Sequence, residues 1–109
     1  MSTTLEDDLF LMTNIRGRSS GLPMNIWISP RGHAHHSARI KVQMDHREKF
    51  DTDNLATIRV SDGAVIDRQL SSADLGLVLQ YITKNKAAIL DHWQEKTDGL
   101  ELSRALKPL

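Results

Sequence analysis

The sequence predicts an α+β fold, in which a small antiparallel sheet of about four strands over residues 24–70 packs against a C-terminal helix or helix pair over residues 72–97. Three observations support this fold class. Apolar and polar residues alternate in the middle of the chain, which is typical of strands with one buried face. An Asp62-Gly63 turn separates two such stretches, and apolar residues recur at the helical period from residue 75 onward.

Length and composition favour a single domain. The chain has 109 residues and no cysteine, so it has a common domain size and forms neither disulfides nor thiolate metal sites. We expect one α+β domain over residues 23–99, an N-terminal extension over residues 1–22 that is a short helix or flexible, and a C-terminal tail over residues 100–109. Acidic residues at 6–8 stand where a signal peptide needs basic ones, which favours a cytoplasmic location without membrane contact.

The first elements are predicted from capping and alternation. Thr4 and Asp7 have the spacing of a capping box, which permits a short N-terminal helix. Pro23 then marks the start of a strand, because proline is tolerated at a strand's first residue. Residues 24–29 alternate between apolar and polar positions, and this alternation puts Trp27 on the exposed face.

A second strand is predicted over residues 38–44, where the same alternation turns basic residues to solvent. Its solvent-facing residues are Arg39, Lys41 and Gln43. Although the net charge of the chain is zero, residues 16–49 hold seven Lys or Arg against two acids. Any contact with a polyanion should therefore involve this basic segment.

The third and fourth strands are predicted as a hairpin, with residues 55–60 and 64–70 on either side of its turn. A two-residue turn would place Ile58 opposite Asp67. A three-residue loop with a left-handed Gly63 places Ile58 opposite Ile66 instead, which pairs two apolar residues. We therefore favour the second register.

The C-terminal helix is predicted to begin at Ser71, which caps it together with Asp74. The apolar stripe of the helix runs to Lys84-Asn85. Asn85 then caps a second helix, or one long bent helix continues, and Asp98-Gly99 ends the helical region. The predicted core residues are Ile58, Val60, Ile66, Val78, Ile82, Ile89 and Trp93.

Histidines cluster in the loop before the second strand. His33 and His35 would point the same way in an extended loop and would make a pair of imidazole ligands for zinc, nickel or copper. A metal site needs further ligands, and His46 or Asp45 at the far end of the second strand lies roughly 26 Å from His36 along an extended chain. We therefore favour histidines that are solvated or support the turn, and expect no cofactor and no metal requirement for folding.

Two further hypotheses concern nucleic acid. In the first, Trp27 stacks on a base of a single strand while Arg39, Lys41 and Gln43 contact the strand from one sheet face. Arg16, Arg18 and Arg31 lie at the edges of this surface, and His35 and His36 are further candidate binding residues. In the second, His35, His36 and Lys41 perform acid–base cleavage of RNA, since Arg31 and His36 have the spacing of some helical toxin ribonucleases. Pro30 and Gly32 make this stretch a loop, which argues against the ribonuclease.

Three segments carry a resemblance to a known family. Residues 77–81 (Leu-Val-Leu-Gln-Tyr), residues 87–93 (Ala-Ala-Ile-Leu-Asp-His-Trp) and the loop His33-Ala34-His35-His36-Ser37-Ala38 occur in the order found in domain-of-unknown-function family 4160. The chain resembles these small bacterial proteins over roughly residues 24–97. The family's loop has two prolines and a third histidine, and Ala38 stands at the place of that histidine.

The resemblance implies an α+β fold without an established activity and a partner encoded by a neighbouring gene, in a toxin–antitoxin-like arrangement. We therefore expect a non-enzymatic binding or regulatory module that acts with a partner protein. Single-stranded nucleic-acid binding through residues 16–49 is the alternative, and a His-dependent ribonuclease or metal site is the second alternative. The sequence does not fix the oligomeric state.

Overall fold

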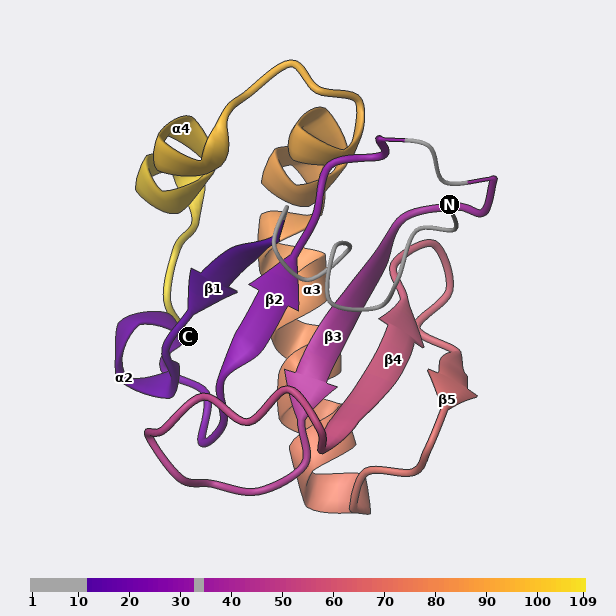
Figure 1. Ribbon diagram of the computed structural model, residues 1–109, viewed down its shortest axis with the longest axis vertical. Helices are drawn as coiled ribbons and strands as arrows, with labels where there is room; N and C mark the ends of the chain where they lie inside the picture. The colour runs from indigo at the N-terminus through magenta and orange to yellow at the C-terminus, as the bar shows by residue number, and fades with distance from the viewer. Residues whose placement is uncertain (1–11, 33–34) are drawn as a thin grey trace.

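The computed structural model describes residues 12–32 and 35–109 and has an α+β architecture, as the sequence predicts (Figure 1). The strands are β1 (Thr13–Ile15), β2 (Ile26–Ile28), β3 (Arg39–Gln43), β4 (Leu55–Arg59) and β5 (Val65–Asp67). The helices are α2 (Gly17–Ser20), α3 (Ser72–Trp93) and α4 (Gly99–Ala105). The strands form one five-stranded sheet in the order β1-β2-β3-β4-β5, and every neighbouring pair is antiparallel.

Alternation determines the two faces of this sheet. Ile28, Ile40 and Ile58 lie opposite one another on β2, β3 and β4, and all three are fully buried. They belong to the same apolar cluster as Val78, Ile82 and Ile89 of α3, which runs across one face of the sheet (Figure 1). Trp27, Lys41 and Thr57 form the neighbouring row of opposed residues, so they point to the other face.

The N-terminal part of the chain adds a strand that the sequence does not reveal. β1 pairs with β2 through Asn14 and Trp27, so residues 13–15 of the expected extension belong to the sheet. Three residues are too few for alternation to be recognised. The helix predicted from Thr4 and Asp7 lies outside the described residues.

The β4–β5 hairpin differs from the predicted register. Gly63 has φ +73°, as expected for a left-handed turn residue. Its N–H donates to the carbonyl of Arg59, whose N–H donates to the carbonyl of Ala64, so the loop has one residue more than predicted. Ile58 therefore lies opposite Val65, with a bulge beside it. Ile66 is 37% exposed, and its assignment to the core was wrong because Val65 takes the inward position.

The helical region begins as predicted and follows the alternative of one long helix. The side chain of Ser71 accepts a hydrogen bond from the N–H of Asp74, which confirms the cap. α3 is then one helix of 22 residues rather than two. Asn85 caps no second helix, because its buried amide binds the backbone of Lys107 through two hydrogen bonds of 2.7 and 2.9 Å.

The last residues form a helix and a docked tail. Asp98 starts α4 with a capping box that includes Glu101, so the stop predicted at Asp98-Gly99 is a helix start, and α3 has already ended at Trp93. Leu102 is fully buried, and the N–H of Leu109 donates to the carbonyl of Ser20 at the end of α2. In the part of the chain described, none of the helices combines the length and the apolar character needed to cross a membrane.

Candidate functional site

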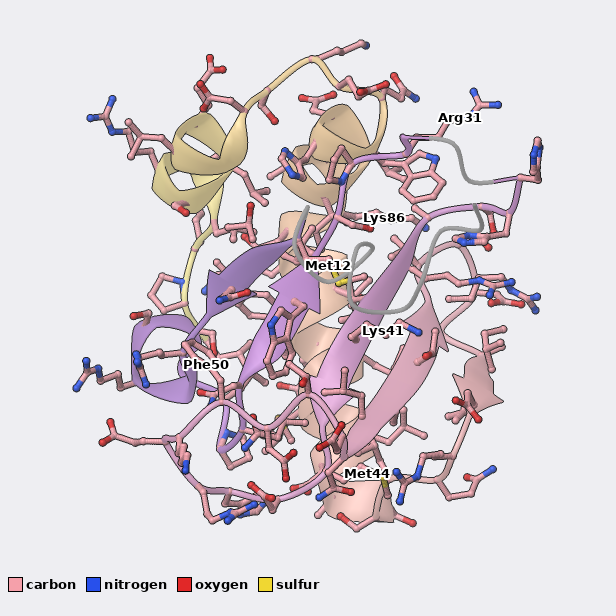
Figure 2. All side chains as sticks on the ribbon, in the orientation of Figure 1. Met12, Arg31, Lys41, Met44, Phe50 and Lys86 are labelled. Carbon is pink, nitrogen blue, oxygen red and sulfur yellow. The ribbon has the colours of Figure 1, made fainter. Side chains whose placement is uncertain are left out.

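Basic side chains gather at the end of the sheet where β3 begins and β4 ends. We call Arg31, His36, Arg39, Arg59 and Lys86 the basic sheet end. Arg39 and Arg59 are strand partners, and Nζ of Lys86 donates to the carbonyl of Ser61 in the β4–β5 turn over 3.4 Å. Figure 2 shows the labelled Arg31 and Lys86 toward this end.

The C-terminal end of α3 fixes the loop of the basic sheet end. The backbone N–H of Arg31 donates to the carbonyl of Trp93 over 2.9 Å, which leaves the exposed Arg31 side chain at the rim. The ring of His36 lies 5.5 Å from that of Trp93, at an interplanar angle of 31°. Two loop residues thus take their positions from one tryptophan.

Arg59 and Asp62 form a forked ion pair within this site. Nε and Nη2 of Arg59 donate to the two carboxylate oxygens over 2.8 and 2.7 Å, and the N–H of Ala64 donates to Oδ1. The hydrogen bonds from Arg59 first, and that from Ala64 next, hold the pKa of Asp62 well below its usual range. The same carboxylate raises the pKa of Arg59. Such a bidentate pair is a strong charge-assisted contact.

Among the described residues, Arg39 has no equivalent carboxylate. Its Nε is buried without a hydrogen-bond partner, and no ion pair of Arg39 occurs among residues 12–32 and 35–109. The side chain as a whole is half-buried. Two guanidinium groups therefore project from opposed positions on β3 and β4, and one aspartate pairs with only one of them. The described residues of this site therefore carry a local excess of positive charge.

His36 is held in a defined tautomer. Its Nδ1 lies 2.7 Å from the carbonyl oxygen of Ser37. A carbonyl only accepts hydrogen bonds, so Nδ1 carries the proton and Nε2 holds the lone pair of the neutral ring. Nε2 is thus the atom of His36 that can accept a proton or a hydrogen bond. His35 is exposed beside it.

Lys41 lies further along β3 from the basic sheet end. Its Nζ donates to Oγ1 of Thr57 over 2.7 Å, in the middle of the sheet. Figure 2 shows the side chain lying over β3 and β4. Lys41 therefore has a structural partner in the position where the sequence suggests a contact with nucleic acid.

Trp27 is buried, which corrects the prediction that it is exposed for base stacking. It is 2% exposed and packs against Phe50 at a ring-centroid distance of 5.5 Å. Phe50 belongs to the loop of residues 44–54, which crosses the face of the sheet that lacks α3 (Figures 1 and 2). The guanidinium carbon of Arg16 lies over the ring of Phe50, 4.4 Å from the ring centroid. Strand alternation places Trp27 on the correct face but does not reveal this cover.

Gln43 was also predicted to face solvent, and it is fully buried. Its side-chain amide donates to the carbonyls of Arg47 and Lys49 over 3.2 and 3.1 Å, so it holds the loop 44–54 in place. Arg16 and Arg18 also contact this loop, at the carbonyl and the carboxylate of Glu48 respectively. These two arginines therefore serve the loop and do not belong to the basic sheet end.

The histidines considered as metal ligands are far apart in the structure or lie outside the described residues. His33 is not among the described residues, and His35 is exposed. Nε2 of His46 lies 2.9 Å from Oδ2 of Asp74 at the start of α3, so this histidine ties the loop to the helix. Within the described ranges, no three His, Cys, Asp or Glu side chains are grouped to hold a metal ion.

Sequence reasoning missed Arg59, Asp62 and Lys86. The spacing of Arg59 and Asp62 across a turn permits an ion pair, but only the strand register places Arg59 beside Arg39. The chain was also compared with known proteins. A scan against family models and searches of curated proteins and solved structures found no match. Membership of family 4160 therefore stays a prediction from the motifs.

Proposed function

We propose that this chain is a non-enzymatic binding module that acts with a partner protein and receives an acidic segment of that partner at the basic sheet end. The observation that carries the proposal is the opposition of Arg39 and Arg59 on adjacent strands, where Asp62 pairs with Arg59 and no described carboxylate pairs with Arg39. Clusters of arginine recognise acidic segments by forked hydrogen bonds and charge complementarity. The excess positive charge favours an anion that the described residues do not supply.

A protein partner is favoured over single-stranded nucleic acid. Proteins that bind single strands combine a cationic groove with exposed aromatic rings, and Trp27 is packed under Phe50. The arginines of the basic segment are also divided, because Arg16 and Arg18 contact Glu48 at the loop 44–54. A continuous track for a phosphate backbone is therefore lacking among the described residues.

A ribonuclease needs an acid and a base at the same phosphodiester. His36 presents Nε2 as a proton acceptor, but the Nζ of Lys41 is hydrogen-bonded to Thr57. The hydrogen bond to Thr57 engages the group that would act as the acid, so binding is the function we propose.

The resemblance to family 4160 supports the choice of partner, since that family is often encoded beside small partner genes. The test is a titration of the neighbour-encoded protein and of labelled single-stranded RNA at two salt concentrations. We expect the neighbour-encoded protein to bind more tightly at physiological salt. If RNA binds, the logarithm of its binding constant should fall linearly with the logarithm of the salt concentration, with a slope of about −0.7 for each phosphate contacted. Submicromolar RNA affinity, abolished by replacing Arg39 and Lys41 with Ala, would overturn the proposal.

A further inference from the structure

We infer that Arg39 is the anchor of a carboxylate-binding subsite, which takes a Glu or Asp side chain of an acidic peptide segment next to the Arg59–Asp62 pair. This inference rests on the proposed function and specifies the ligand chemistry of the same site. It follows from three observations on the arginines of β3 and β4.

The first observation is the register. Arg39 and Arg59 are directly opposite on adjacent strands, where like charges repel each other at close range. Asp62 neutralises Arg59, while none of the carboxylates in residues 12–32 and 35–109 pairs with Arg39. A second carboxylate bound to Arg39 would give each of the two arginines its own negatively charged partner.

The second observation is the buried Nε of Arg39. An N–H donor that is removed from water without an acceptor has lost hydrogen bonding that the unfolded chain retains. A carboxylate that meets the guanidinium along its Nε–Nη edge would supply the missing acceptor. Because that atom is covered in the ligand-free chain, the Arg39 side chain must shift when the ligand binds.

The third observation is that the structure already contains a forked contact between an arginine and a carboxylate. The two carboxylate oxygens of Asp62 accept hydrogen bonds from Nε and Nη2 of Arg59. The neighbouring arginine on β3 has the same side chain and projects from the same face. Asp62 therefore shows how a flat, two-oxygen anion fits these strands, and it also reduces the charge that an external ligand meets.

The test uses a short dye-labelled peptide of alternating Glu and Val as the probe, followed by fluorescence anisotropy. Arg39→Lys keeps the charge but removes the fork, so we expect a loss of affinity of about tenfold. Arg104→Lys is the matched control, because Arg104 is an exposed arginine on α4. This variant should bind like the parent chain.

Asp62→Asn is the second variant, and it should gain affinity. The amide keeps an oxygen for the N–H of Ala64 but releases the charge of Arg59 to the probe, so we expect about a threefold increase. Circular dichroism should show that all three variants are folded. Equal affinities for Arg39→Lys and Arg104→Lys would contradict the subsite, as would tighter binding of an oligonucleotide than of the peptide.

The neighbour-encoded protein separates this inference from the proposed function. If that protein binds the parent chain and Arg39→Lys equally, the module has a protein partner but the subsite is wrong. If it does not bind the parent chain, the proposed function is wrong. If Arg39→Lys lowers the affinity for that protein by about tenfold while Arg104→Lys does not, the result supports both the proposed function and the subsite.

Discussion

Nδ2 of Asn25 donates a hydrogen bond of 3.2 Å to Oε1 of Gln43, and the two side chains are 1% and 0% exposed. Asn25 immediately precedes β2 and Gln43 ends β3, so the contact joins neighbouring strands beside the loop 44–54. Both amides then bind the loop backbone: Asn25 reaches the carbonyl of Glu48, and Gln43 accepts the N–H of Asp51. This buried pair helps to hold the loop whose Phe50 packs on Trp27.

Replacing Gln43 with Leu should destabilise the protein by about 2–4 kcal/mol. The change leaves partly buried N–H and carbonyl groups of the loop unpaired, and each such group costs about 1–3 kcal/mol unless water reaches it. Urea unfolding measures the loss. Gln80→Leu, at an exposed position of α3, is the control and should change stability by less than about 0.5 kcal/mol. Similar small effects at both positions would show that the loop network is not needed for stability.

The observed hairpin register predicts unequal roles for two isoleucines. Ile82 is 4% exposed in the core and Ile66 is 37% exposed on β5. Ile82→Ala should cost about 2–5 kcal/mol, and Ile66→Ala should cost less than about 1 kcal/mol. Denaturant midpoints of the two variants test this. A larger loss at Ile66 than at Ile82 would favour the register with Ile58 opposite Ile66.

The charge network of the loop should fail in acid. Arg47, then Gln43, hold the pKa of Asp45 well below its ordinary value of 3.8 by hydrogen bonds. A carboxylate whose pKa is lower in the folded state than in the unfolded state stabilises the folded state when the pH is above the unfolded pKa. This stabilisation is lost as the pH falls through the folded pKa. The parent chain should therefore be more stable than Asp45→Asn at neutral pH, and this difference should shrink as the pH falls below about 4 and vanish only below the lowered pKa of the folded state. A difference independent of pH would contradict the assignment.

Tyr81 is the single tyrosine of the chain, so its ionisation can be followed without interference from other tyrosines. Burial raises the pKa of Tyr81 from 10.0 to about 12. Because the unfolded state loses this proton first, stability should fall as the pH rises above the unfolded value. Near-ultraviolet absorbance should show tyrosinate forming at a higher pH in native protein than in urea. Coinciding titrations would show that the hydroxyl is not buried.

Much of the fold follows from local pattern, and the differences arise where distant segments meet. The alternation of Ile26 and Ile28 and the cap at Ser71 predict their elements because neighbouring residues determine them. Alternation also gives the face of Trp27, but its exposure depends on a loop some twenty residues away in the sequence. The role of Asn85 likewise depends on the tail, since its partner is Lys107.

The same distinction applies to the candidate site. Arg31, His36 and Arg39 stand out in the sequence because they lie in one basic segment. Arg59 lies outside that segment, and its place depends on the pairing of β3 with β4. The basic segment therefore gives three of the five residues of the basic sheet end, while the strand register places Arg59 and α3 places Lys86.

The most direct test of a partner-binding role is the affinity of the neighbour-encoded protein for two double variants, measured by isothermal titration calorimetry. One variant carries Arg39→Ala and Arg59→Ala at the basic sheet end, and the other carries Arg16→Ala and Arg18→Ala at the loop 44–54. Both remove two positive charges, so non-specific attraction changes equally. We predict that the first variant loses affinity by more than about tenfold while the second binds within about twofold of the parent chain. Equal affinities of the two variants would contradict the claim that the basic sheet end receives the partner.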